Sequence, residues 1–275
     1  MMEQKSGTET SDRYTNFASS IFLIFVSLLF LGFIVLPLSS IFLNLNPTQV
    51  TNQLSNPEII NALIIGLVTA SLATILSVIL AIPTSYLLAT RKFHGKSIIE
   101  TILDIPLVLP PAVAGLALLL TFAPKGILGA VLRQLGIVLP GSMLAVILAQ
   151  VFVSSTFTLR SSRTAFENID RRLVDNASLF TNSRMKIFLT VTLPLARDGI
   201  LSGIVMTWAR SMGEFGATLL FAGNLPGVTQ TMPLAIYTLM SKDIMASNIL
   251  SAILIVVSFT VLIGFRILSR NKVVE

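Results

Sequence analysis

The sequence predicts an all-α polytopic membrane protein with about six transmembrane helices, and three observations support this fold class. Of the 275 residues, 53% are hydrophobic and 12% are charged, and the mean hydropathy is +0.85. A typical soluble domain has about 25% charged residues, so these proportions indicate a chain surrounded by lipid. Apolar runs long enough to cross a bilayer alternate with shorter polar segments. One polar segment, residues 160–198, is longer than the others and strongly basic.

The first two apolar runs are each long enough for a transmembrane helix. A polar tail, residues 1–16, precedes the first run, which extends from about 17 to 43. This run is too long for the core of a signal peptide and ends without a small-residue cleavage site, so it is expected to remain as a helix. The second run, about 60–89, contains Pro83 and is expected to bend or break there.

The other four runs complete the expected bundle and cover residues 102–122, 143–159, 199–220 and 246–268. The third run contains Asp104 and prolines at positions 106, 110 and 111. A short tail, residues 269–275, follows the sixth run. The sequence therefore predicts one transmembrane domain, 17–268, that includes the polar segment 160–198.

Lysine and arginine are distributed unequally between the two sides of the expected bundle. With a cytoplasmic N-terminus, fifteen of them lie on the inner segments and three, Lys125, Arg133 and Lys242, lie on the outer loops. Inner loops of membrane proteins carry an excess of these residues, so both termini and the segment 160–198 are expected in the cytoplasm. The cations flank apolar runs without interleaved aromatic residues, so the net charge of +6 does not indicate nucleic-acid binding.

The segment 160–198 reads as two short amphipathic helices with a break between them. Asp170 and Ser183 are residue types that cap helix N-termini, and each precedes one helix. Asn182 lies at the break and is expected to adopt the left-handed conformation that ends a helix. The apolar residues of each helix are spaced to share a face: Leu173, Ala177 and Phe180 in the first, and Met185, Phe188 and Val191 in the second. Two small helices at the cytoplasmic surface suit docking into another protein.

Part of this segment resembles the "EAA" signature of importer permeases in ATP-binding-cassette (ABC) transporters. The matching positions are Asp175, Asn176, Ala177, Thr181, Phe188, Val191, Leu193 and Pro194. The resemblance implies that the segment docks into a groove on an ATPase subunit. Three positions depart from the signature: Asp175 replaces the usual Glu, Asn176 replaces the first Ala, and Thr181 replaces the Gly that makes the break. Asn182 is expected to make the break in this sequence. The alternative is a basic inner loop that binds no partner.

Asp104, Arg210 and Glu214 lie inside apolar runs, where an unpaired charge facing lipid costs about 3 kcal/mol. Arg210 and Glu214 are four residues apart, so they share a helix face and can neutralise each other. Two interpretations remain open for Arg210. It is either an oxyanion contact in the transport pathway or, the preferred interpretation, half of an internal ion pair that fixes helix packing, since a tightly held anion would slow release. Asp104 is near the inner end of its run and can reach the interface.

The neighbourhood of this pair resembles permeases for tetrahedral oxyanions. The residues that carry the resemblance are Arg210, Gly213, Glu214 and Gly216 within 209–218, together with Pro110 and Pro111 in the third run. The stretch 224–237 is most similar to the molybdate/tungstate branch, and sulfate is the alternative substrate. Gly213 and Gly216 permit close helix contact. Pro226 and Gly227 predict a turn on the outer face.

The resemblance implies a type I ABC importer permease fold in a multi-pass protein of a prokaryotic plasma membrane. It also implies a homodimer with the pathway at its interface, two ATPase subunits that bind Mg-ATP beneath it, and an external binding protein that delivers the oxyanion. This chain is then expected to be no enzyme and to hold no cofactor. Gly95, Lys96 and Ser97 lack the rest of a P-loop, and His94 has no companion ligands.

Two other function classes were open at this level. An ion-coupled secondary transporter would use Asp104 or Glu214 as its coupling carboxylate, and inverted repeats would support it. A membrane scaffold without a substrate would have no use for charges inside its spans. Neither class accounts for the docking segment.

Overall fold

The computed structural model describes residues 5–270, with side chains from residue 20 onward except at positions 266 and 268–270. Every regular element within that range is a helix. The chain divides into two units, Met1–Val50 and Thr51–Glu275. Four helices are individually long and apolar enough to cross a membrane, and two bent helix pairs, Lys96–Val108 with Pro111–Phe122 and Arg184–Leu195 with Arg197–Met212, raise the number of spans to as many as six. The expected all-α, six-span class is therefore confirmed, although two of the spans are not single helices.

The first unit consists mainly of one long helix, α1 (Lys5–Leu43). The helix begins at Lys5, so most of the expected polar tail continues the span as helix, while residues 1–4 lie outside the described part. From Ser20 to Leu43 the side chains are apolar and largely exposed. Such a helix needs lipid or a partner chain around it. A short helix, α2 (Pro47–Leu54), crosses the boundary to the second unit.

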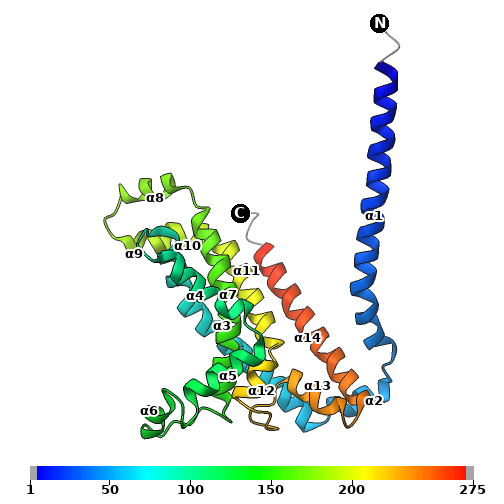
Figure 1. Ribbon diagram of the computed structural model, residues 1–275, viewed down its shortest axis with the longest axis vertical. Helices are drawn as coiled ribbons and strands as arrows, with labels where there is room; N and C mark the ends of the chain where they lie inside the picture. Colours follow the sequence, from blue (N-terminus) through cyan, green and yellow to red (C-terminus); the bar gives the residue numbers. More distant parts are fainter. Residues whose placement is uncertain (1–4, 271–275) are drawn as a thin grey trace. The chain divides into compact units, whose positions relative to one another are not determined.

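The second unit contains three long helices, α3 (Pro57–Thr90), α7 (Met143–Glu167) and α14 (Ile244–Arg270). Asn56 caps α3 by accepting a hydrogen bond from the Glu58 N–H at 3.0 Å, and Pro57 occupies the first turn, where its missing N–H costs nothing. The helix continues through Pro83, so of the expected bend or break the break does not occur. α3 packs along α7, and α7 along α11 (Arg197–Met212), which makes these three helices the centre of the bundle (Figure 1).

The third and fifth apolar runs are each divided between two helices. The third forms α4 (Lys96–Val108) and α5 (Pro111–Phe122), whose axes differ by 113°. Leu109 is extended before the Pro110–Pro111 pair, which disfavours a helical residue in front of it and donates no backbone N–H. The fifth run forms α11 and α12 (Gly216–Phe221), separated by Gly213, Glu214 and Phe215. The apolar runs 102–122 and 199–220 are therefore present, but each is interrupted by a short non-helical break.

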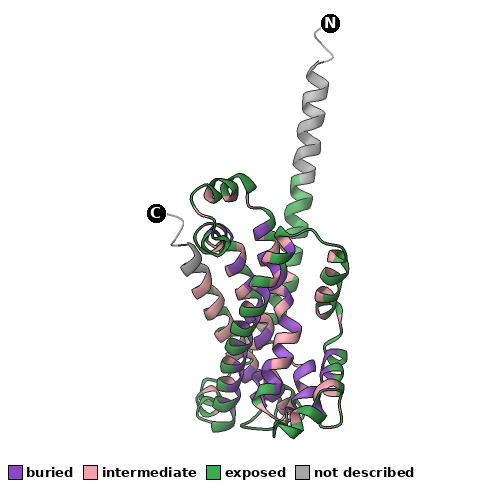
Figure 2. Cartoon of the chain, turned by 90° about the vertical axis from the view of Figure 1, so that its left-hand side faces the viewer, coloured by how far each residue is buried: buried purple, intermediate pink, exposed green. Residues whose placement is uncertain are grey.

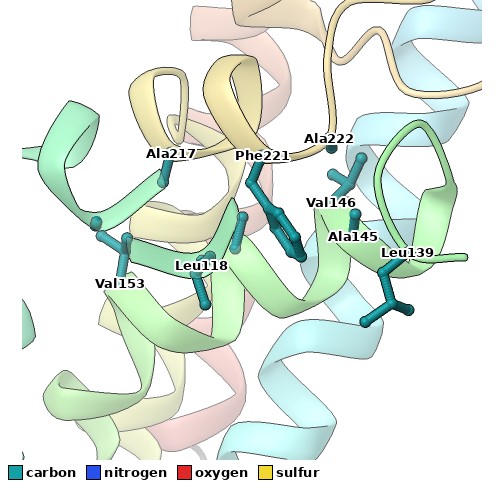
Figure 3. Packing of buried hydrophobic residues seen from close by; sticks show 10 residues of the cluster. Leu118, Leu139, Ala145, Val146, Val153, Ala217, Phe221 and Ala222 are labelled. Carbon is teal, nitrogen blue, oxygen red and sulfur yellow. The ribbon is translucent and has the colours of Figure 1, made fainter. Parts of the chain in front are cut away.

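The main apolar core joins the two broken spans to α7. Phe221 of α12 lies between Leu118 of α5 and Val146 of α7, and the small residues around it are fully buried (Figure 3). The Phe221 ring also lies 6.0 Å from the Phe122 ring. Buried residues concentrate inside the bundle, whereas the surface of the apolar helices is exposed (Figure 2). This distribution suits helices that face lipid on the outside.

Two further short helices lie in the connections of the second unit. α6 (Gly129–Gln134) lies in the loop between α5 and α7, and α13 (Met232–Met240) precedes α14. The predicted turn at Pro226–Gly227 is present, with Gly227 at a φ of 75°. Asn224, Gln230 and Thr238 are hydrogen-bonded to one another and hold this turn against α13.

Candidate functional site

The predicted docking segment forms several short helices between α7 and α11 (Figure 1). They are α8 (Arg171–Ser178), α9 (Arg184–Ile187), a π-helix η1 (Phe188–Thr192) and α10 (Leu193–Leu195). Both predicted caps are confirmed. An oxygen of Asp170 accepts a hydrogen bond from the Arg172 N–H at 2.9 Å, and the Ser183 hydroxyl accepts one from the Lys186 N–H at 3.3 Å.

The break between α8 and α9 is made without a left-handed residue. Within the described chain every residue with positive φ is a glycine, so the expected conformation of Asn182 is wrong. Instead the Thr181 hydroxyl accepts a hydrogen bond from the Ser183 N–H at 3.3 Å, and Ser183 then starts α9. Side-chain hydrogen bonds of this kind offer the backbone an alternative to continuing a helix. The threonine that replaces the family glycine therefore contributes directly to the break.

An exposed apolar patch covers the tip of the segment. It consists of Leu173, Leu179, Phe180 and Met185 and is called the docking patch below. Phe180 is 89% exposed, Leu179 81% and Met185 66%. Arg171, Arg172, Arg184 and Lys186 are exposed on the same two helices. An apolar patch rimmed by charges is typical of a surface that binds another protein. Sequence reasoning missed Leu179, although its position next to Phe180 was the available signal.

Phe188 faces the transmembrane helices and not the surface of the segment. Its ring is 4.7 Å from the Tyr86 ring of α3 and 6.1 Å from the Phe166 ring of α7. Met185 is exposed, whereas Phe188 and Val191 are half-buried, so these three residues do not share an exposed face. Phe188 therefore anchors the segment to the bundle.

The remaining residues of the predicted coupling set lie in α8, η1 and α10. Asp175 and Asn176 are exposed, Ala177 and Thr181 are half-buried, and further along Leu193 is half-buried and Pro194 exposed. α8 contacts both α9 and η1, so the segment is one compact body. The structure thus brings together the residues that the spacing selected.

Ion pairs join the C-terminal end of α7 to α4. Asp104 lies 3.3 Å from Arg160, so it is paired across two helices. Glu100 lies 3.2 Å from Arg163 and 3.7 Å from Lys96. All of these side chains keep partial contact with solvent, so each pair contributes about 1 kcal/mol or less.

Arg210 and Glu214 form the predicted ion pair. Nη2 of Arg210 lies 2.7 Å from Oε2 of Glu214, and the side chains are 30% and 1% exposed respectively. The other carboxylate oxygen, Oε1, accepts a hydrogen bond from the Ala217 N–H at 2.9 Å. Glu214 therefore neutralises Arg210 at the end of α11 and also caps the first turn of α12. The geometry agrees with the structural interpretation of the pair.

A ladder of small and polar residues joins α7 to α11 through hydrogen bonds and close packing. The hydroxyls of Ser154 and Ser211 lie 2.8 Å apart, and those of Thr158 and Thr207 2.7 Å apart. Toward the C-terminal end of α7, a Cβ atom on Gly203 would lie 2.9 Å from Cβ of Ser161, so the helices are in direct contact. Sequence reasoning missed this ladder. Its signal was the spacing of four residues between small side chains: Gly199, Gly203, Thr207 and Ser211.

The signature residues Pro110, Pro111 and Gly216 are brought together, whereas Gly213 is not part of the contact. A Cβ atom on Gly216 would lie 2.8 Å from Cβ of Pro111, which confirms the close approach expected at Gly216. A Cβ atom on Gly213 would meet nothing closer than 3.8 Å, so no close contact requires glycine there. Among the residues that the structure describes, no group of three His, Asp or Glu residues is placed to hold a metal ion.

Comparison with known proteins places these features in a family context. Residues 81–273 match the model of the family described as "Binding-protein-dependent transport system inner membrane component". The chain is 34% identical over 251 residues to the probable transport system permease protein NifC of Clostridium pasteurianum, covering 90% of this chain and 88% of that one. It is 39% identical over 187 residues to the molybdenum transport system permease protein ModB of Escherichia coli K12, covering 68% and 81%. A solved bacterial ABC transporter involved in the import of alginate has a similar fold, with a TM-score of 0.77, 16% identity and coverage of 96% and 99%.

Proposed function

The chain belongs to the binding-protein-dependent transport system inner membrane component family, and on that premise we propose that it is the permease subunit of an ATP-driven molybdate importer. The family assignment makes it a multi-pass membrane permease and not an enzyme. Its fold is that of ABC importer permeases. The observation that carries the substrate is the similarity to molybdenum permeases over two thirds or more of the chain.

Molybdate is preferred over sulfate as the transported anion. The curated relative reported above whose name gives a substrate is the molybdenum permease of Escherichia coli, and this agrees with the resemblance carried by residues 209–218 and 224–237. Tungstate is expected to be accepted as well, since it has the same charge and tetrahedral geometry. The proposal is therefore a pathway for a tetrahedral dianion.

The docking patch is proposed as the contact with an ATPase subunit. Leu179 and Phe180 directly follow α8, and most of the surface of each side chain is exposed. Burying each of them in a partner groove contributes about 1.5–3 kcal/mol, and the surrounding arginines add charge complementarity to an acidic rim. The ATPase subunit binds Mg-ATP and hydrolyses it, because this chain carries no nucleotide-binding motif.

The pathway is proposed to lie between two copies of the chain. A dianion carries a strongly held hydration shell, so it needs a polar passage that is shielded from lipid and closed at one end at a time. Arg210 is neutralised by Glu214 and does not provide a free cation for tight binding. Selectivity then comes mainly from an external binding protein that delivers the anion to the outer loops.

ATP-driven closure of the ATPase pair is proposed to move the docking segment as a rigid body. α7 and α11 flank this segment in sequence and are bonded to each other along their length. A displacement of the segment is therefore passed to both helices together, and the bundle alternates between inward-open and outward-open states.

The test is reconstitution of the purified permease with its ATPase subunit and binding protein in liposomes. Uptake of molybdate, tungstate and sulfate is then measured in parallel, with and without ATP. Molybdate and tungstate should accumulate only when ATP and both partners are present. Accumulation by the permease alone, driven by a proton or sodium gradient, would contradict the proposal. Such coupling is not favoured, because Asp104 and Glu214 are both paired with arginines.

A further inference from the structure

We propose that the breaks in the third and fifth spans form a single joint, and that Glu214 and Arg210 are the positioning residues that hold it together. The joint consists of the break at 109–111, the break at 213–215 and the contact between Pro111 and Gly216. This inference rests on the proposed transport function and deepens it. It names the route by which the docking segment acts on the third span.

The two breaks are in direct contact. A Cβ atom added to Gly216 would lie 2.8 Å from Cβ of Pro111 and 3.3 Å from the Ala112 nitrogen. One added to Gly115 would lie 2.8 Å from Cα of Ala217. The backbones of α5 and α12 therefore touch at the point where each half-helix begins. The core around Phe221 continues this contact toward the ends of both helices (Figure 3). α5 and α12 are thus packed as one body.

Glu214 closes the gap that the break leaves in the fifth span. A broken helix has unpaired carbonyl groups at the end of its first half and unpaired N–H groups at the start of its second half. Arg210 lies in the last turn of α11, and Glu214 caps the first turn of α12. Each charge lies near the helix end whose dipole it stabilises, and the two side chains bind each other at 2.7 Å. The ion pair therefore links the two half-helices where backbone hydrogen bonds are missing.

The joint is connected to the docking segment through α11. Ser211, the residue after Arg210, is bonded to two residues of α7, since Gln150 donates to its carbonyl at 3.1 Å and its hydroxyl lies 2.8 Å from that of Ser154. α7 and α11 both lead into the docking segment. A movement of that segment therefore reaches Arg210 through a rigid helix pair, passes through Glu214 to α12, and reaches α5 through the contact between Gly216 and Pro111.

Through the joint, α5 of the third span moves together with the docking segment that the ATPase subunit binds. When the joint is intact, the outer half of this span moves with the docking segment. When it is loosened, the ATPase still binds and hydrolyses ATP, but α5 no longer follows the docking segment, while α4 stays paired with α7. Arg210 and Glu214 thus act on transport by positioning helices and not by contact with the anion.

A cysteine reporter measures this movement without any transported anion. The chain has no natural cysteine, so Leu120→Cys introduces a single thiol in the last turn of α5, where Leu120 is 63% exposed. The rate of maleimide labelling is measured in the complete complex with the ATPase subunit, with and without a non-hydrolysable ATP analogue. Vanadate is avoided because it is itself a tetrahedral oxyanion.

Glu214→Ala and Gly216→Ala are the variants that loosen the joint. Asp243→Ala and Gly66→Ala are their controls. Asp243 also caps a helix, accepting hydrogen bonds from the Met245 and Ala246 N–H groups at 3.0 Å, but it lies outside the joint. A Cβ atom on Gly66 would meet nothing closer than 3.8 Å, so alanine fits there. Arg210→Lys keeps the positive charge, and it replaces Glu214→Ala as the test variant if Glu214→Ala does not assemble with the ATPase subunit.

In the reporter protein the ATP analogue should change the labelling rate by about fivefold or more, the range typical of coupling between sites. Both joint variants should lose this response while their ATPase activity stays within about twofold of the reporter protein, and both controls should keep it.

The proposal is overturned if the reporter does not respond, or if the joint variants respond as the controls do. It is also overturned if Arg210→Lys keeps the response but raises the half-saturating molybdate concentration, because Arg210 would then be a substrate contact. Molybdate uptake in the same liposomes tests the proposed function separately, since labelling requires no anion.

Discussion

Two carboxylates inside apolar runs differ in their surroundings, although the sequence presents them alike. Glu214 is almost completely buried; its Oε1 accepts a hydrogen bond from the Ala217 N–H, and its Oε2 lies 2.7 Å from Arg210 as an ion pair. Asp104 of α4 is partly exposed and pairs with Arg160 of α7, which is half-exposed itself. Removing a buried partner leaves an uncompensated charge, whereas a solvated pair contributes little. Only Glu214 is therefore expected to be essential to the packing of the spans.

Phe180 and Phe188 show how a single residue decides the outcome of a docking experiment. Phe180→Glu places a charge at the most exposed position of the docking patch. Binding of the ATPase subunit should weaken by about tenfold or more, since even 1.4 kcal/mol of lost contact has that effect. The measurement is co-purification of the ATPase subunit with the tagged permease, together with the amount of permease in the membrane, which should not change.

Leu135→Glu is the matched control for this prediction. Leu135 is a large apolar residue, 69% exposed, in the loop between α5 and α7, far along the chain from the docking patch. Phe188→Glu is not a clean test, because its ring packs against Tyr86 and Phe166 and the charge would disturb the bundle. Normal ATPase binding by Phe180→Glu would show that the docking patch does not contact the ATPase.

At the scale of elements, the contact between α7 and α11 is expected to depend on glycine. Gly203→Leu adds a side chain where even a Cβ atom would lie 2.9 Å from Cβ of Ser161 and 3.0 Å from Cα of Thr158. Overpacking of this kind costs about 1–3 kcal/mol. The variant should lower the thermal unfolding midpoint of the detergent-solubilised protein and reduce ATP-dependent uptake.

The control for this element is Gly264→Ala in α14, where an added Cβ atom has no neighbour within 4 Å. Alanine has a higher helix propensity than glycine, so this variant should be as stable as the wild type or slightly more stable. If Gly203→Leu unfolds at the same temperature as Gly264→Ala, the two helices are not in the close contact described here.

Local signals in the sequence were sufficient for some elements and not for others. The caps at Asp170 and Ser183 were predictable, because capping depends on a side chain and the backbone two or three residues away. The inward orientation of Phe188 was not, because it depends on Tyr86 and Phe166, which are distant in sequence. The break after α11 was also hidden, because the apolar run continues through it to α12. The partners of Glu214, Arg210 and Ala217, are local, but the contact between Gly216 and Pro111 joins residues that are distant in sequence.

At the scale of the whole molecule, the six-span class followed from composition and run length, since lipid imposes both. The orientation of the spans rests on the distribution of lysine and arginine, and it stays a prediction. The absence of natural cysteine makes this prediction testable with single thiols. Ile127→Cys lies in the expected outer loop and Leu179→Cys in the docking patch, at residues that are 82% and 81% exposed.

A membrane-impermeant maleimide should label Ile127→Cys in intact cells and Leu179→Cys only after the membrane is opened, because the basic segment 160–198 is expected inside. The cysteine-free parent controls for background labelling. The reverse pattern would invert the topology and place the docking patch where no ATP is present. With the expected topology, excess ATPase subunit should also slow the labelling of Leu179→Cys in opened membranes and leave Ile127→Cys unchanged. That combination ties the orientation of the chain to its partner, because only a patch that is both cytoplasmic and occupied is protected in this way.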